Sequence, residues 1–423
     1  MEIKSTQIKK ERVLLAGVHL GLKNELEDTT DESMHELEEL AKTAGAEVVS
    51  VVIQNKSELE SGTYMGEGKL LEIAAAIEEL EVDTVIFDDE LSPVQIRNIT
   101  DILGVMVLDR SMLILDIFAM RAKSGEGKLQ VELAQLKYRL PRLRGMGTVM
   151  SRTGAGIGTR GPGETKLETD RRHIHHRIQA LSEELEELKK HRELLRSRRK
   201  KDKVITVSLV GYTNAGKSTL LNSLTDANVF AEDKLFATLD PTSRGLELED
   251  ARKVLLVDTV GFIRKLPHHL VEAFKSTLEE AVIADVLVHV VDASNPEFKN
   301  QIAVVDSVLK DIGATGKPEI LCYNKCDKGN YPETVEKSND RVNVFISAKK
   351  KTGLDDLIAA IADLAPGKKR EVVVNIPYSM GSLVNELHTN QKVLSEEYTD
   401  SGTKLTLLAD SVTYEKLRDY IIE

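Results

Sequence analysis

The stretch from Gly211 to Ser218 has the residue types and the spacing that hold a phosphate chain. It reads GYTNAGKS, which fits G-x-x-x-x-G-K-[ST], and it follows the apolar run VITVSLV, which predicts a strand. Glycines let such a loop wrap phosphates with its amide groups at the start of a helix. Lys217 would contact the β- and γ-phosphate oxygens, and the Ser218 hydroxyl would bind Mg²⁺. The residues expected to bind phosphate are Gly211, Tyr212, Thr213, Asn214, Ala215, Gly216, Lys217, Ser218 and Thr219.

A second motif, N-K-x-D, would select the base. The apolar run PEILCY predicts a strand, and NKCD follows it directly. The Asp327 carboxylate can accept hydrogen bonds from both the ring N–H and the exocyclic amine of guanine, whereas adenine offers neither donor there. We therefore expect GTP to bind and ATP to be rejected. The other residues expected at the base are Asn324 and Lys325, with Ser347, Ala348 and Lys349 from the shorter motif in FISAKK.

A third motif, DTVG, begins at the last residue of the predicted strand KVLLVD. Asp258 would hold the Mg²⁺ shell and the Gly261 amide would meet the γ-phosphate, with Thr259 and Val260 between them. Each short motif alone is typical of an ordinary turn after a strand, but four motifs in this order are not. The set predicts a guanine-nucleotide-binding protein that hydrolyses GTP to GDP with Mg²⁺, using Lys217 and Gly261 as catalytic groups.

The elements that carry these motifs imply a multidomain α/β protein, because 423 residues are too many for one ordinary domain. The motifs lie in a domain predicted at residues 204–366. Residues 1–110 alternate β-rich and helical runs, which is typical of a parallel sheet with crossover helices. Those runs are Arg12–Val18, Glu32–Thr43, Ala46–Val52, Gly68–Leu80, Thr84–Asp88, Pro93–Leu103 and Val105–Leu108. A small α+β domain is expected at residues 370–423, from the runs VVVNI, Gly381–Leu387, KLTLLA and Tyr414–Ile422.

Residues 111–203 predict an antiparallel helical hairpin. Leucines at alternating spacings of four and three form one apolar seam from Leu129 to Leu143, and a similar seam returns from Ile174 to Leu188. The glycine-rich stretch between them, Gly145 to Gly163, would form the loop at the tip. Residues 137–203 hold 19 Lys and Arg against 9 Asp and Glu, in a chain whose formal net charge is −12. This pattern indicates a basic arm that binds a polyanion, although a solvated helix with a basic end would show the same charge pattern.

The remaining composition favours a cytoplasmic protein. No apolar run approaches the roughly 20 residues of a membrane-spanning helix, and the apolar stretch near the N-terminus is too short for a signal peptide. The cysteines, Cys322 and Cys326, are too few for a disulfide framework and are expected to be small buried residues. We expect a monomer.

The motifs of residues 204–366 resemble the Ras-like P-loop GTPases of the translation-factor superclass. The segment SRTGAGIGTRGPGETKLETDRR, together with the long basic helix after it, resembles the signature of the HflX family of ribosome-associated GTPases. This resemblance implies docking on rRNA of the large ribosomal subunit and the splitting or rescue of stalled ribosomes in a stress response. Its RNA-binding residues would be Arg152, Gly156, Gly158, Arg160, Gly161, Gly163, Arg171 and Arg172.

The resemblance also bears on the switch segments. In KLFATLDPTSR, Thr238 would be the second Mg²⁺ ligand, with Thr242 as the competing candidate. Phe262 follows DTVG where many GTPases carry the glutamine that orients the attacking water, and a phenyl ring cannot do so. Intrinsic hydrolysis is therefore expected to be slow. Asn214 would either help to hold K⁺ and so assist catalysis, or serve as an ordinary turn asparagine.

Two other functions fit parts of the sequence. A GTP-gated adaptor could bind a protein partner through the apolar seam without any RNA. Alternatively, the run TYMGEGKL could hold a second phosphate near Lys69 and make the protein an ATP-assisted RNA remodeller, although helix capping explains the same glycines more simply. Salt-dependent association with ribosomes would separate RNA docking from apolar docking.

Overall fold

A computed structural model describes residues 10–21, 30–150, 162–201, 204–225, 235–236, 241–265, 267, 275–329 and 341–422. The chain divides into two compact units. The first contains Met1–Glu193, Ala231–Asp240 and Val260–Leu278. The second contains Leu194–Phe230, Pro241–Thr259 and Glu279–Glu423. The segments 231–240 and 260–278, the second of which begins within the DTVG motif, are thus grouped with the N-terminal part of the chain.

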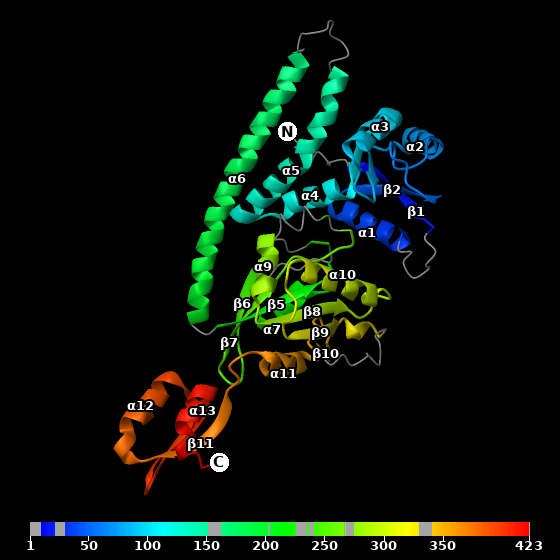
Figure 1. The fold of residues 1–423 in the computed structure, drawn as a ribbon. Helices are drawn as coiled ribbons and strands as arrows, with labels where there is room; N and C mark the ends of the chain where they lie inside the picture. Colours follow the sequence, from blue (N-terminus) through cyan, green and yellow to red (C-terminus); the bar gives the residue numbers. More distant parts are fainter. Residues whose placement is uncertain are drawn as a thin grey trace, which may run out of the picture. The chain divides into compact units, whose positions relative to one another are not determined.

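The N-terminal part of the first unit is the parallel α/β subdomain that the sequence predicted (Figure 1). Its elements are β1 (Arg12–Leu20), α1 (Thr30–Thr43), β2 (Glu47–Lys56), α2 (Glu67–Leu80), β3 (Thr84–Phe87), α3 (Pro93–Leu103) and β4 (Met106–Asp109). The strands pair in parallel in the order β2-β1-β3-β4. Alternate residues of β1 enter different apolar clusters, Val13 and Leu15 with α1, and Leu14 and Ala16 with α2 and α3. Both faces of the sheet are therefore buried, as a parallel sheet requires.

Three helices follow: α4 (Arg110–Arg121), α5 (Gly125–Met150) and α6 (Pro162–Lys201). Helix α5 continues through Gly145 to Met150, so the tip loop that the sequence predicted from Gly145 onward does not begin there. A glycine in a helix interior costs only about 1 kcal/mol relative to alanine, which does not end a helix of this length. Ion pairs join α5 to α6, between Glu132 and Arg177 and between Glu126 and Arg192.

The predicted apolar seam of α5 is not its most buried face. Val131, Ala134 and Tyr138 are 2–4% exposed and belong to the apolar cluster of the N-terminal subdomain. Leu129 and Leu133, which lie on the predicted seam, are only half-buried. The sequence did not identify this more buried neighbouring face, because leucine spacing alone does not reveal that helix α4 and the N-terminal subdomain cover it.

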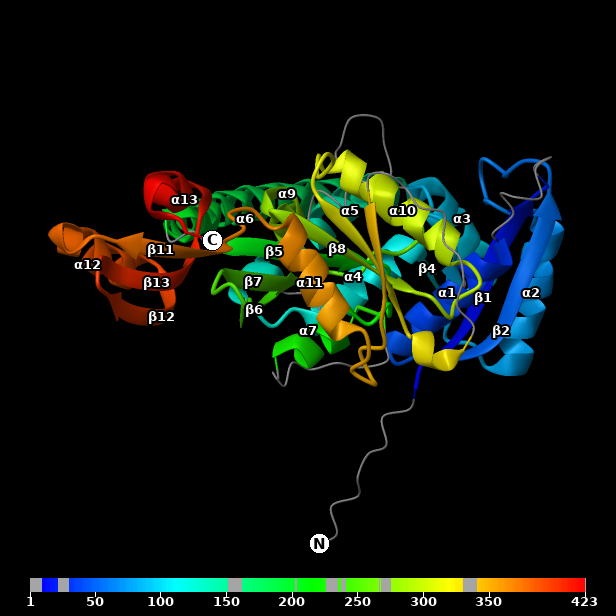
Figure 2. The same cartoon turned by 90° about the horizontal axis from the view of Figure 1, so that it is seen from below.

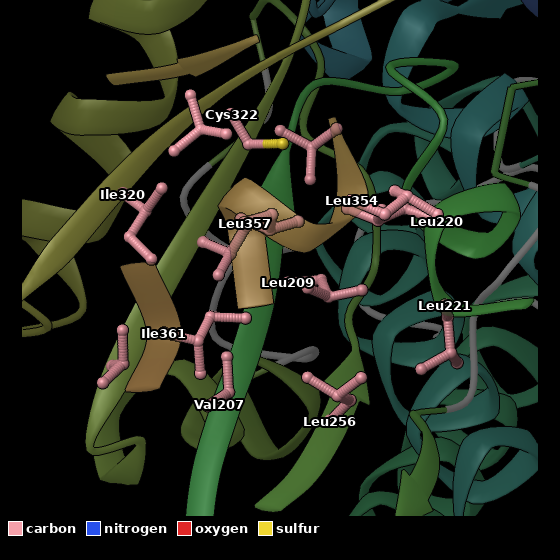
Figure 3. Close-up of a cluster of buried hydrophobic side chains, with 14 of the residues drawn as sticks. Val207, Leu209, Leu220, Leu221, Leu256, Ile320, Cys322, Leu354, Leu357 and Ile361 are labelled. Atoms are coloured by element: carbon pink, nitrogen blue, oxygen red, sulfur yellow. The ribbon is translucent and has the colours of Figure 1, made fainter. Parts of the chain in front are cut away.

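The second unit contains a six-stranded sheet in the order β10-β9-β8-β5-β7-β6, parallel except for β6. Its elements are β5 (Ile205–Gly211), α7 (Lys217–Thr225), β6 (Thr242–Glu247), β7 (Lys253–Asp258), α9 (Lys275–Ile283, partly in the first unit), β8 (Val286–Asp292), α10 (Phe298–Asp311), β9 (Glu319–Asn324), β10 (Arg341–Phe345) and α11 (Leu354–Leu364). Side chains of β5, such as Val207 and Leu209, pack against Leu357 and Ile361 of α11 (Figure 3). This core fixes the strand ends from which the nucleotide loops emerge.

The C-terminal residues form the small α+β domain, with the strand order β11-β13-β12 (Figure 2). Its elements are β11 (Arg370–Ile376), α12 (Gly381–Asn390), β12 (Lys392–Thr399), β13 (Gly402–Ala409) and α13 (Ser411–Leu417). Val374, Leu405 and Leu407 share a cluster with Leu383 and Leu387 of α12. The strand β12 was absent from the sequence-based description. Within the described ranges, none of the helices combines the length and apolar character that a membrane span requires.

Candidate functional site

The phosphate-binding loop lies between β5 and α7, where the sequence predicted it. Gly211 has a φ of +148° and Gly216 a φ of +96°, values that residues other than glycine rarely adopt. A Cβ on Gly216 would lie 2.3 Å from the side-chain Nδ2 of Asn324, and one on Gly211 would lie 2.2 Å from the Val290 carbonyl oxygen. The two glycines are therefore required both for the turn of the loop and for its close approach to β8 and the NKCD motif.

Lys217 begins helix α7 and points back into the loop. Its Nζ donates to the carbonyl oxygens of Gly211 at 3.1 Å and Tyr212 at 2.9 Å. Burial lowers the pKa of Lys217 to about 8, although the nearby Asp258 carboxylate opposes that change. A phosphate chain in this loop would supply the negative charge that a buried ammonium group needs.

Ser218 and Asp258 bring two oxygen atoms together beside this lysine. Asp258 ends β7, which pairs in parallel with β5, so the carboxyl ends of both strands lie at the same sheet edge. The Ser218 hydroxyl donates to an Asp258 carboxylate oxygen at 2.7 Å. A hydroxyl and a carboxylate are oxygen donors of the kind that Mg²⁺ prefers, so the pair fits the predicted metal role. Thr259 is oriented by a hydrogen bond from its hydroxyl to the Leu209 carbonyl oxygen at 2.8 Å.

The NKCD motif emerges from the end of β9 and is tied to the phosphate-binding loop. The Asn324 side-chain amide donates to the Ala215 carbonyl oxygen at 2.9 Å, and its oxygen accepts from the Ala348 amide at 3.0 Å. Lys325 donates to the Asn214 carbonyl oxygen at 2.8 Å and forms an ion pair of 2.7 Å with Asp292. Asn324 therefore connects three sequence-distant motifs, which explains why this side chain is needed besides any contact with the base.

The surroundings of Asp327 favour its ionised form, which accepts hydrogen bonds. The Ser347 hydroxyl donates to its carboxylate at 2.6 Å, and this bond, helped by the charges of Lys350 and Lys349, lowers the pKa of Asp327. Lys349 itself is exposed. An ionised carboxylate at this position provides the two acceptor oxygens that guanine recognition requires.

Two residues of this site were not predicted from the sequence. Asp292 ends β8 and holds Lys325, and Ser223 of α7 donates to the Ala348 carbonyl oxygen at 2.8 Å. The position of Asp292, an acid directly after a buried strand at the sheet edge where the other motifs lie, is a signal that could have identified it. Ser223 offers no such signal, because it lies one turn after Thr219 in an ordinary helix.

The structure does not place every predicted switch residue. Thr238 lies outside the described residues. Thr242, its competitor, is the first residue of β6 and pairs with Asp258 in the antiparallel register. Val260 and Gly261 belong to the first compact unit, where Val260 is 6% exposed and the following Phe262 is 1% exposed. The P-loop, Asp258, Thr259 and the two base motifs all lie in the second unit.

The predicted RNA-binding tip is largely outside the described residues. That applies to Arg152, Gly156, Gly158, Arg160 and Gly161. Gly163 lies in the first turn of α6, and further along the same helix Arg171 is half-buried and Arg172 exposed.

The glycine-rich run before α2 has a structural role. Gly66 precedes the helix, and its amide donates to the Gln54 side chain at 2.9 Å. Lys69 forms an ion pair of 2.7 Å with Glu72 on the same helix. These contacts give Gly66 and Lys69 a structural role. They are residues of the run that had suggested a second phosphate site.

One described group away from the nucleotide loops has metal-ligand atoms close together. The donor atoms of His289, Asp306 and Glu319 lie within 4.8 Å of one another. Arg341, however, donates to both Asp306 oxygens at 2.8 and 3.0 Å and pairs with Glu319 at 3.1 Å. The guanidinium already supplies the positive charge that two partly buried carboxylates need, so the group is explained as an ion-pair network.

The family models and the related sequences that match this chain agree with the nucleotide site described above. Three family models match the chain: "GTP-binding GTPase N-terminal" at residues 31–119, "GTP-binding GTPase Middle Region" at 121–199, and "50S ribosome-binding GTPase" at 206–325. GTPase HflX of Caldanaerobacter subterraneus is 52% identical over 98% of this chain and 94% of its own length. GTPase HflX of Escherichia coli K12 is 41% identical, over 93% and 92% respectively. A GTP-binding protein from Sulfolobus solfataricus, crystallised with GDP, is 29% identical over 84% of this chain and 98% of its own, with a TM-score of 0.43.

The resemblance that the glycine-rich signature suggested is thus confirmed along nearly the whole chain. The motifs that the structure brings together are those of guanine-nucleotide binding, and the matching relatives are GTPases. The protein therefore belongs to the HflX family and is a GTPase that binds guanine nucleotides and hydrolyses GTP.

Proposed function

We propose that this GTPase is a switch that binds the large ribosomal subunit in its GTP form and splits or rescues stalled ribosomes under stress. The observation that carries the proposal is the match of residues 206–325 to a family described as 50S ribosome-binding GTPases. The basic stretch at residues 137–203, with 19 Lys and Arg against 9 Asp and Glu, supports an rRNA partner. The described members of the proposed contact are Gly163 in the first turn of α6, the half-buried Arg171 and the exposed Arg172.

The chemistry of the switch is phosphoryl transfer from GTP to water. Lys217 neutralises the β- and γ-phosphate oxygens, and the amide of Gly261 meets the γ-phosphate as negative charge develops. Ser218 and Asp258, with Thr238, are the residues that would hold Mg²⁺, which supplies charge neutralisation at the phosphates. Asp327 fixes the guanine. Because Phe262 cannot orient water, this chain's own residues leave the hydrolytic step incomplete, and an external element is needed to accelerate it.

Sedimentation with purified 50S subunits tests the proposal. The protein loaded with a non-hydrolysable GTP analogue should co-sediment with subunits, and it should do so much less with GDP. Binding through phosphates should weaken by orders of magnitude between roughly 50 and 200 mM salt if six or more contacts form. Binding that does not depend on salt or on the nucleotide would contradict the proposal and favour an apolar protein partner for the helical arm. Splitting is tested separately, by the loss of 70S particles in a gradient after addition of protein and GTP.

Potassium is a second, separable part of the proposal. Asn214 adopts a left-handed conformation with a φ of +60° and is exposed at the surface of the phosphate-binding loop, where its side chain could reach an ion near the phosphates. GTP turnover measured in KCl and in NaCl at equal ionic strength should then be faster in KCl. Equal rates would remove this role of Asn214 and leave the assignment of the nucleotide site unchanged.

A further inference from the structure

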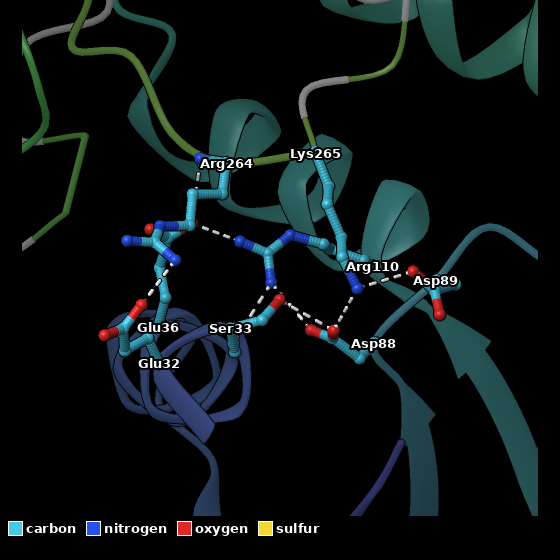
Figure 4. A network of polar contacts seen from close by, with 8 residues as sticks. All are labelled: Glu32, Ser33, Glu36, Asp88, Asp89, Arg110, Arg264 and Lys265. Carbon is cyan, nitrogen blue, oxygen red and sulfur yellow. Dashed lines mark hydrogen bonds and ion pairs between the residues drawn. The ribbon is translucent and has the colours of Figure 1, made fainter. Parts of the chain in front are cut away.

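We infer that Arg264 and Lys265 are positioning residues that couple the DTVG segment to the N-terminal subdomain and thereby set the relative affinity for GTP and GDP. They follow Gly261 by three and four residues, in the segment that must adjust when a γ-phosphate is present. Both bind acidic side chains of the subdomain (Figure 4). This inference depends on GTP binding and not on the ribosome.

The acidic partners are organised around a buried arginine. Arg110, 1% exposed, donates to an Asp88 carboxylate oxygen at 2.8 Å and to the Ser33 carbonyl oxygen at 3.3 Å, and it forms an ion pair with Glu36. The Ser33 hydroxyl donates to the other Asp88 oxygen at 2.7 Å. Burial alone would raise the pKa of Asp88, but the charges of Arg110 and Lys265 outweigh it, and the pKa lies below its usual value. The subdomain therefore presents an ionised, hydrogen-bonded surface at the carboxyl end of β3.

Arg264 binds this surface through both its backbone and its side chain. Its amide donates to the Glu36 carboxylate at 3.2 Å, and its guanidinium forms an ion pair of 2.7 Å with Glu32. The Arg264 side chain is 10% exposed, so the pair is shielded from most of the solvent. A backbone contact fixes the path of the chain and not only the end of a flexible side chain.

Lys265 provides the second attachment. Its ammonium group contacts Asp88 at 2.5 Å and Asp89 at 2.6 Å. The residue has a φ of +51°, a left-handed conformation that costs a lysine roughly 1 kcal/mol or more. The surrounding contacts offset this cost. The observed path of the chain at Lys265 therefore depends on the attachment.

Apolar packing holds the neighbouring residues in the same unit. Ile263 and Val260 are 1% and 6% exposed and share a cluster with Leu235 and Phe236 of the preceding switch segment. The Phe236 ring contacts the Phe118 ring of α4 edge to face, with centroids 4.6 Å apart. Described residues of both switch segments are thus anchored on the N-terminal subdomain.

This anchored arrangement coexists with a phosphate site whose polar groups bond to one another. Ser218 donates directly to Asp258, and Lys217 donates to the carbonyl oxygens of its own loop. Binding of GTP with a metal would replace these contacts, and the Gly261 amide is the group expected to meet the γ-phosphate. Because Arg264 follows Gly261 by three residues, an adjustment of the DTVG segment works against the anchor. The anchor therefore opposes the binding of GTP more than the binding of GDP, and GTP that binds must in turn weaken the anchor.

The anchor can be removed without exposing an unpaired buried charge. Arg110 continues to neutralise Asp88 and Glu36 when Arg264 and Lys265 are both replaced by glutamine. In Arg264→Gln/Lys265→Gln, the affinity for a non-hydrolysable GTP analogue relative to GDP should rise about tenfold, as loss of two or three partly exposed ion pairs implies. Stopped-flow measurement with fluorescent nucleotides gives both affinities. Lys368→Gln, which removes an exposed lysine paired with Asp363, is the matched control and should leave the ratio unchanged.

Charge exchange distinguishes coupling from a general loss of packing. Glu32→Arg and Arg264→Glu should each raise the ratio, and the double variant should return it towards the wild-type value because the pair is restored in reverse. Glu32 is on α1 and 39% exposed, so Glu32→Arg changes the anchor without touching the switch segment. In the wild type, backbone amides of α1 should also exchange hydrogen faster with the GTP analogue than with GDP. An unchanged affinity ratio in the folded glutamine variant, or nucleotide-independent exchange in α1, would overturn the inference.

Discussion

Lys217 shows how one side chain makes the nucleotide site depend on protonation. It is 6% exposed, and its ammonium group is balanced by two carbonyl oxygens and by Asp258 instead of water. Burial therefore lowers the pKa of Lys217 to about 8, whereas bound phosphate would raise it again. The free and the nucleotide-bound protein must then differ in proton content above that pH.

The first prediction concerns this proton. Because Lys217 is largely neutral above its pKa of about 8, GTP binding there must take up a proton. Its affinity should be flat up to about pH 7.5 and fall by up to tenfold per pH unit above pH 8. Calorimetry in two buffers of different ionisation enthalpy should show proton uptake near zero at pH 7 and approaching one at pH 9. A constant affinity up to pH 9.5 would contradict the assignment. Lys217→Arg, which does not titrate in this range, is the control.

The second prediction concerns the base. Asp327→Asn keeps the size of the side chain and an oxygen for the Ser347 hydroxyl, but it replaces one acceptor by a donor. Xanthine carries an acceptor where guanine has its exocyclic amine, so preference should shift towards xanthine nucleotides, with GTP binding weakened by at least tenfold. Competition between XTP and GTP in an equilibrium assay measures this. Unchanged GTP affinity would show that Asp327 does not contact the base.

At the scale of elements, the sequence predicts well wherever local signals suffice. Helix α3 occupies the predicted Pro93–Leu103, because Ser92 caps it and Gly104 ends it in a left-handed conformation. The strand β12, by contrast, is polar and mostly exposed, and only its antiparallel pairing with β13 makes it a strand. Such pairing is not local, and sequence patterns do not reveal it.

The same distinction holds for the site. The loops that bind nucleotide are contiguous motifs, and the structure places the P-loop and both base motifs in one unit. The contacts of Asp292 with Lys325 and of Arg264 with Glu32 join residues 33 and 232 positions apart. Each partner is an ordinary charged residue in its own segment, so only the folded chain identifies the pair.

The third prediction tests the contact between two loops of the sheet edge. Gly216→Ala would place a Cβ 2.3 Å from the side-chain nitrogen of Asn324 at a φ of +96°, so this side chain or the loops must shift. Guanine-nucleotide affinity should fall by more than tenfold, and the melting temperature of the nucleotide-free protein should fall by several degrees. Gly245→Ala on β6 is the control, since a Cβ there meets nothing within 4 Å. Equal nucleotide affinities for the two variants would argue against the close packing of these loops.

For the whole molecule, the distribution of charge is more informative than its total. The formal net charge is −12, yet residues 137–203 carry ten positive charges in excess, so the rest of the chain is strongly acidic. An acidic protein repels RNA everywhere except along its basic segment, which favours one orientation on a polyanion. The nucleotide loops lie in the other compact unit from most of that segment, so we expect the proposed ribosome contact and nucleotide binding to be separable by mutation.

The last prediction uses this separation. Arg171→Glu/Arg172→Glu reverses two charges near the start of α6, and it should reduce the acceleration of GTP turnover by 50S subunits while leaving the affinity for GTP unchanged. Lys189→Glu/Lys190→Glu makes the same change of charge later in the same helix. If the contact lies near the start of the helix, this control should affect the acceleration much less. Steady-state phosphate release with and without subunits, at two salt concentrations, measures both effects. Equal losses in the two variants would indicate a general attraction between charges, and no loss in either would remove the described part of the basic segment from the ribosome contact. A fall in GTP affinity would instead show that α6 and the nucleotide loops are coupled, because neither arginine belongs to the nucleotide site.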